Sequence, residues 1–154
     1  MNWDALSAIA ELLGAIAVVA TLIYLSLQIR AQTESTRSAN TIHVRAAAND
    51  INEQIASDPE MSRIYFAGLS GDLEDENDRN RFELIAIQIF RAVEGVFLEY
   101  ERGMVDLPLW EATDELMGWI ISQPGAEASW HRQKRFLAKP FQEYYAARIE
   151  KNST

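Results

Sequence analysis

The chain has 154 residues, of which 48% are hydrophobic and 24% charged. These values are ordinary for a globular protein and exclude wholesale disorder and collagen-like repeats. Because there is no cysteine, disulfide scaffolds, cysteine-ligated zinc, iron–sulfur clusters and thiol catalysis are also excluded. The net charge of −9 argues against a general nucleic-acid binder, since such a protein needs a surface that neutralises phosphates.

The first element along the chain is an uncharged apolar segment at residues 12–29. Extended back to Ala5, it would form a helix of about 37 Å at 1.5 Å per residue, enough to cross a hydrocarbon core of about 30 Å. Trp3 and Tyr24 lie near its two ends, where interfacial aromatic residues are expected. The pattern therefore predicts a transmembrane helix within residues 1–30.

Two alternatives fit this segment less well. A cleaved signal peptide would begin with basic residues and end in small ones, but the chain begins Met-Asn-Trp-Asp and the apolar run ends in Gln28-Ile29-Arg30. A buried helix of a soluble protein would show a polar face, and this segment shows little of one.

The charges that flank the segment predict its orientation. No lysine or arginine precedes it, whereas Arg30, Arg37 and Arg45 follow it. The positive-inside rule then places the N-terminus outside and the rest of the chain in the cytoplasm. We therefore expect a transmembrane helix at 1–30, a helical extension or linker at 31–56, and a cytoplasmic helical domain at 57–154.

Small and polar residues gather on one side of the predicted membrane helix. Steps of four and three residues collect what we call the polar stripe: Ser7, Glu11, Gly14, Val18, Thr21, Leu25 and Gln28. In lipid, small and polar residues mark helix–helix contacts, so the stripe predicts a homo-oligomer. Glu11 would either form a ring that binds protons or cations, or lie hydrated near the outer interface beside the positive end of the helix dipole; the interfacial placement is the simpler one.

The polar segment that follows predicts a continuation of the same helix. Residues 28–56 contain no proline or glycine. Asp58 is typical of a residue that caps a helix, and Pro59 is typical of the first residue inside one. The short helix 59–67 is expected to end at Gly68. The acidic loop 70–78 imitates a calcium-loop spacing, but Asn77 stands where that loop needs glycine, so we expect the acids to cap the next helix instead.

The strongest helix of the remaining chain spans residues 82–102 and is apolar on nearly all faces, which predicts a central, buried position. Within it, the spacing of Arg91 and Glu94 predicts a buried structural ion pair, with a ligand site as the alternative. Further helices are expected at 108–122, 126–137 and 140–151. No stretch alternates like a strand, so the predicted fold class is all-α, with one membrane helix leading into a domain of about five helices.

Charge is distributed unevenly along this domain. Residues 58–115 hold 15 acids and 5 bases, whereas residues 127–151 hold 3 acids and 6 bases. We call the following residues the basic cluster: His131, Arg132, Lys134, Arg135 and Lys139. Its four lysines and arginines are candidates for contact with anionic lipid headgroups or with an acidic surface of the same or a neighbouring subunit, and a solvated face is the default.

Patterns typical of catalysis are missing from the sequence. There is no nucleophile elbow, phosphate-binding loop or dinucleotide-binding glycine pattern. His43 has no acid or second histidine at the spacing of metal ligands on a helix. His131 has only Glu127, at i,i+4, and one such pair does not make a metal site. The sequence therefore predicts no enzymatic activity, cofactor or metal site.

A set of spaced residues supports a resemblance that covers nearly the whole chain. The residues are Arg91, Glu94, Phe97, Tyr100, Gly103, Trp110, Pro124, Gly125, Trp130, Arg135, Phe136 and Phe141, preceded by GAIAVVATLIYLSLQIR. With them, the chain resembles a group of small, uncharacterised bacterial proteins with a single membrane span. The resemblance implies a bacterial inner-membrane location and implies no activity, ligand or functional residue.

Three functional hypotheses follow. The leading one is a non-enzymatic inner-membrane protein that contacts lipid and associates with copies of itself through the polar stripe. The second is an oligomeric channel or ion-conducting pore in which Glu11 forms an outer ring. The third is a monomeric anchor or adaptor that presents its helical domain to another membrane protein.

Overall fold

The computed structural model describes residues 3–152, and within this range it leaves the side chains of residues 4–10, 40, 43, 47 and 150–152 undescribed. The side chains of Ser7 in the polar stripe and of His43 therefore lie outside the described part. The described residues form six α-helices and one short 3-10 helix and no strand, which confirms the all-helical class. The chain divides into two units, Met1–Ala39 and Asn40–Thr154.

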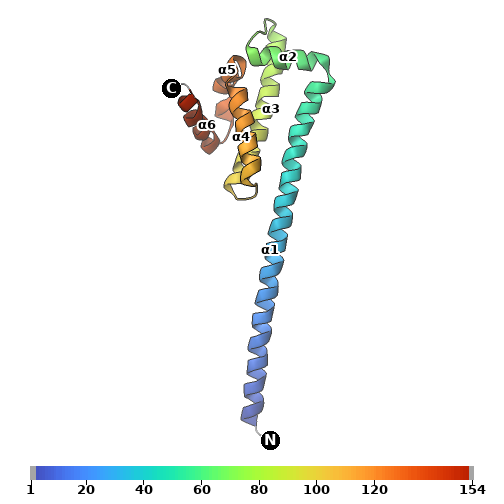
Figure 1. The fold of residues 1–154 in the computed structure, drawn as a ribbon, viewed down its shortest axis with the longest axis vertical. Helices are drawn as coiled ribbons and strands as arrows, with labels where there is room; N and C mark the ends of the chain where they lie inside the picture. Colours follow the sequence, from blue (N-terminus) through green and yellow to red (C-terminus); the bar gives the residue numbers. More distant parts are fainter. Residues whose placement is uncertain (1–2, 153–154) are drawn as a thin grey trace. The chain divides into compact units, whose positions relative to one another are not determined.

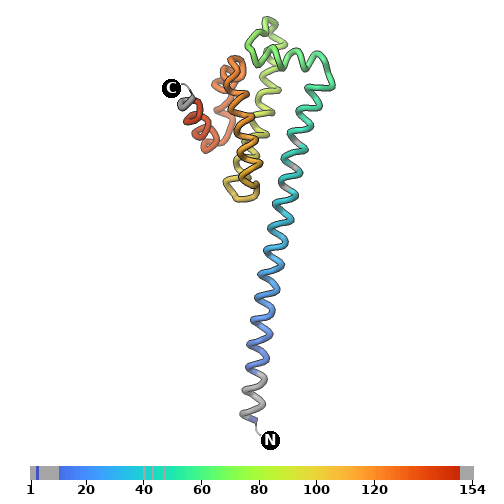
Figure 2. Tube along the Cα trace, viewed as in Figure 1, coloured from blue at the N-terminus to red at the C-terminus, as the bar shows by residue number. Residues whose placement is uncertain are grey.

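The first helix, α1 (Trp3–Ser57), is continuous over 55 residues, so the apolar helix does run on through the polar segment. Asp58 alone separates it from α2, and the chain turns sharply there (Figure 2). The ring of Pro59 disfavours helical dihedrals in the residue before it, which explains the break. As predicted, the Asp58 carboxylate caps the next helix by accepting a hydrogen bond from the Glu60 N–H at 2.9 Å.

The second helix, α2 (Pro59–Ser70), is longer than expected. The predicted end at Gly68 is wrong, because the helix stops at Gly71, whose φ of 84° is left-handed and whose N–H bonds to backbone carbonyls of the last turn. Gly68 has a packing role instead. A Cβ built there would lie 2.1 Å from the ring of Phe82, so only glycine allows this contact.

The third helix, α3 (Glu76–Glu101), begins six residues before the predicted start. The Asp75 carboxylate accepts a hydrogen bond from the Asp78 N–H at 3.0 Å, which confirms that the acidic loop caps this helix. One face of α3 is buried, and it consists of Phe82, Ile85, Ala86, Phe90, Val93, Val96 and Phe97. The other is not, since Leu84 is 64% exposed, so the expectation of burial on nearly all faces is wrong.

The remaining elements are α4 (Leu107–Ile121), α5 (Pro124–Gln133), the 3-10 helix η1 (Lys134–Phe136) and α6 (Lys139–Asn152). The single helix predicted over 126–137 is thus divided in two. Helix α3 contacts α2, α4, α5 and α6, and runs antiparallel to α4, which confirms its central position (Figure 1).

An aromatic cluster forms the centre of this domain. Trp130, Phe141 and Tyr145 are fully buried and meet edge-on, with ring centroids 4.9–5.9 Å apart. Phe90 packs edge-on against Trp130 at 5.5 Å. These rings join α3, α5 and α6 into one core, because edge-to-face pairs add to the stabilisation from burial.

Candidate functional site

The predicted membrane helix exposes its apolar side chains over the whole uncharged segment. Residues 11–39 of α1 are exposed on every side. Large hydrophobic residues from Leu12 to Ile29 keep between 46% and 65% of their surface open. By length and composition, this is one helix that can cross a membrane. Such a surface is unfavourable in water, at about 25 cal/mol per Å² of apolar area, so it requires a cover of lipid or protein.

The described part of the polar stripe is open to close approach by another helix. A Cβ built on Gly14 would meet no atom within 4 Å. The Thr21 hydroxyl donates to the Ala17 carbonyl at 2.8 Å, so its proton is used within α1 while its oxygen can still accept a bond. These features allow helix contact along the stripe.

The predicted buried pair of Arg91 and Glu94 is not formed. Arg91 is exposed on the outward side of α3, the side that also carries Leu84. Glu94 is half-buried and accepts a hydrogen bond from the Ala138 N–H just before α6. Their i,i+3 spacing permits a pair, but the burial of Phe90 and Val93 turns Arg91 toward solvent and Glu94 toward the turn before α6.

A different acid holds α3 to α5. Glu83 accepts hydrogen bonds from the fully buried Ser129 hydroxyl at 2.8 Å, from the Gln133 amide, and from the Arg132 guanidinium. Arg132 of the basic cluster is therefore paired with an acid of its own chain. The partners lie 46 to 50 positions apart, so no local spacing pointed to this network.

Other members of the basic cluster have neighbours of other kinds. The Arg135 guanidinium lies over the Phe136 ring at 4.7 Å, and Lys139 is exposed at the start of α6. His131 Nε2 lies 3.9 Å from a Glu127 carboxylate oxygen, as the i,i+4 spacing allows. Arg132, Arg135 and His131 therefore each have a different neighbour, and Lys134 is half-buried in η1.

A second polar cluster joins α4 to α6. The buried Tyr145 hydroxyl donates to the Asp114 carboxylate at 2.9 Å, and Arg148 pairs with Asp114 and, at 3.5 Å, with Glu115. Burial raises the pKa of the Tyr145 phenol. Arg148 also covers Gly118, where an added Cβ would lie 2.7 Å from a guanidinium nitrogen. This cluster lies beside a cavity of about 220 Å³. Its polar groups are paired with one another, so we interpret it as a structural link between α4 and α6.

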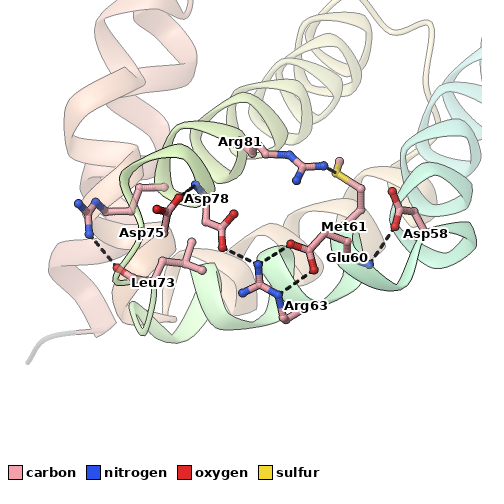
Figure 3. Close-up of polar contacts among 9 residues, drawn as sticks. Asp58, Glu60, Met61, Arg63, Leu73, Asp75, Asp78 and Arg81 are labelled. Carbon is pink, nitrogen blue, oxygen red and sulfur yellow. Dashed lines mark hydrogen bonds and ion pairs between the residues drawn. The ribbon is translucent and has the colours of Figure 1, made fainter.

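A third cluster joins α2 to α3 at the surface. Arg63 lies between Glu60 and Asp78, with nitrogen–oxygen distances of 2.7 Å and 2.5 Å (Figure 3). The hydrogen bond from Arg63 lowers the pKa of Glu60, and the bonds to both carboxylates raise the pKa of Arg63. The arrangement orients the loop between the two helices. Among the described residues, no three acids or histidines are grouped so that they could hold a metal ion.

The sequence did not reveal an apolar groove of about 310 Å³ within the second unit. Its floor is buried and comes from Val93, Val96 and Ile120. One wall is the stretch of α1 that contains Ile51, which packs against the core without being fully buried. Tyr65 of α2 also lines the groove, so four helices, α1 to α4, contribute to it, and only the packing brings their residues together.

No family model, no curated protein and no solved structure matches this chain.

Proposed function

We propose that the chain is a non-enzymatic, single-span protein of a bacterial inner membrane, which associates with copies of itself through the polar stripe. The observation that carries the proposal is the exposed apolar segment at residues 12–29 of α1. Burying a large aliphatic side chain contributes roughly 1.5–3 kcal/mol, so the segment gains far more from entering lipid than from staying in water.

The flanks of the segment support one orientation. Arg30, Arg37 and Arg45 lie on the C-terminal side, and a cytoplasmic leaflet with anionic lipids attracts such residues. The helical domain would then lie in the cytoplasm, where the exposed Lys139 and Arg135 of the basic cluster can contact anionic headgroups.

The polar stripe supplies the surface for self-association. Lipid tails are as apolar as leucine, so helices in a bilayer associate where small residues permit close contact and polar groups can bond across the interface. Gly14, with open space around it, and Thr21, with an acceptor oxygen left over, provide these features on one side of α1.

Native mass spectrometry from mild detergent tests the proposal. The full chain is expected to give a discrete oligomer, and Gly14→Leu is expected to dissociate it because a leucine on the stripe separates the helices. Ala20→Leu is the matched control, since it makes the same kind of enlargement off the stripe, about 120° around the helix from Gly14. An oligomer that survives Gly14→Leu, or a monomeric wild type, would count against the stripe.

A further inference from the structure

The apolar groove has a chemical composition that points to an occupant. Apolar residues dominate its lining, including Val93 and Val96 on α3 and Leu116 and Ile120 on α4. Among the lining residues whose side chains the structure describes, Arg45 on the α1 wall is the one charged residue, and none is acidic. The described part of the groove thus presents an apolar surface together with one positive charge.

The guanidinium of Arg45 is available for a ligand. Arg45 is exposed, and it forms no ion pair with any residue that the structure describes in the range 3–152. A guanidinium presents a planar fork of donors that matches a carboxylate in a bidentate arrangement. Charge complementarity therefore favours a ligand with an anionic head that pairs with Arg45.

The volume limits the apolar part of the ligand. A methylene group takes roughly the volume of a water molecule, ~30 Å³, so a groove of about 310 Å³ holds a chain of about ten methylenes. That is the size of one alkyl chain. The buried floor residues Val93 and Ile120 would cover one side of it, while the exposed Ala112 and Leu116 form the rim.

We propose that this groove binds a single-chain fatty acid, with the alkyl chain along α3 and α4 and the carboxylate paired with Arg45. The chemistry of the groove does not depend on self-association of the protein. The proposed membrane location enters only as the source of the ligand, because a bilayer holds and supplies free fatty acid.

The test uses the full chain in nanodiscs of phosphatidylcholine and a dodecanoic acid that carries a photoreactive diazirine. After illumination, mass spectrometry locates the labelled peptides. We expect labelling of the peptides that contain Ile51, Val93 and Leu116, and we expect unlabelled dodecanoic acid to suppress it more strongly than dodecanol does. This competition uses the wild-type chain, so its outcome does not depend on the folding of a variant.

Two pairs of variants then separate the chain from the head. Ala112→Trp fills the groove and should abolish its labelling, whereas Ala147→Trp, on the exposed surface of α6, should not. Arg45→Gln should lower the labelling about threefold, the size expected for the loss of one solvent-screened ion pair, whereas Arg91→Gln, also exposed on a helix, should leave it unchanged.

Several results would overturn the proposal. They are labelling confined to residues 12–29, equal competition by dodecanol, groove labelling that persists in Ala112→Trp, and cross-links that place a phospholipid or a second copy of the chain in the groove. Label on residues 12–29 without label in the groove would contradict the ligand proposal and leave the membrane span standing. Label in the groove without label on residues 12–29 would contradict the span instead.

Discussion

The backbones of Gly68 and Gly125 touch where α2 crosses α5. A Cβ built on Gly125 would lie 1.8 Å from the Gly68 carbonyl oxygen, a distance at which no side chain fits. The absence of a Cβ on Gly125 lets α5 approach the backbone of α2 closely, and this contact brings α5 and its buried Trp130 onto the core.

We expect Gly125→Ala to destabilise the helical domain by about 1–3 kcal/mol, because the methyl group forces the two helices apart. Gly95→Ala is the control, since an added Cβ there meets nothing within 4 Å and alanine is the better helix former by about 1 kcal/mol. Denaturant unfolding followed by tryptophan fluorescence would measure both. Equal effects of the two substitutions would contradict the close contact.

The cap of α2 gives a second prediction. Asp58→Ala should lower the free energy of unfolding by about 1 kcal/mol, because the Glu60 N–H loses its acceptor. Asp106→Ala is a matched control: Asp106 stands at the same position before α4 but makes no side-chain cap bond there. If both variants lost the same stability, the cap bond would not be the cause.

The link between α3 and α5 gives a third prediction. A double-mutant cycle with Glu83→Gln and Arg132→Gln should give a coupling energy of about 1 kcal/mol, since the Arg132 side chain is largely exposed and solvent screens the pair. Glu83→Gln with Arg135→Gln should give no coupling, because Arg135 lies over Phe136 instead. A coupling near zero for the first pair would show that the bond contributes nothing.

The buried Tyr145 gives a prediction for pH dependence. Burial raises the pKa of its phenol above the ordinary value of about 10, so the folded state holds this proton more tightly than the unfolded chain does. The contribution of this phenol to the free energy of unfolding is therefore complete below pH 10. It is lost as the pH rises above 10, with a slope of up to about 1.4 kcal/mol per pH unit.

Urea unfolding at several pH values between 9 and 11 would measure this loss. In Tyr145→Phe the loss should be smaller, and the remainder should reflect Tyr65 and Tyr144, whose pKa values burial also raises. An unchanged slope in Tyr145→Phe would show that this phenol does not titrate differently in the folded and unfolded states.

The charge of Glu11 separates assembly from conduction. If Glu11 lies hydrated at the outer interface, Glu11→Gln should leave the oligomer seen by native mass spectrometry unchanged, because no contact across the stripe depends on the charge. Conductance of reconstituted bilayers that disappears in Glu11→Gln would instead support the pore hypothesis, and conductance that is absent from the wild type would dispose of it.

Local signals in the sequence predict where the helices begin and end better than they predict which residues contact one another. Asp58 and Pro59 predict the start of α2 correctly, because capping depends only on neighbouring residues. The prediction that α2 ends at Gly68 is wrong, because a glycine can allow close packing as well as end a helix. Only the position of Phe82 in the fold distinguishes these two roles.

The polar contacts show the same limit more strongly. Arg91 and Glu94 have the spacing of a pair and do not form one, whereas Glu83 and Arg132 lie 49 positions apart and do. The apolar groove was missed for the same reason, because four helices contribute to it and no single segment carries its pattern.

Thiol labelling in intact cells tests the central claim, a single span with the N-terminus outside, most directly. The chain has no cysteine, so Asn2→Cys and Ser70→Cys each introduce one unique thiol. A membrane-impermeant maleimide should label position 2 in intact cells whose outer membrane is opened, and position 70 only after the inner membrane is also made permeable. Equal labelling of both positions before that step, or a chain that stays in the soluble fraction, would contradict the proposed membrane span.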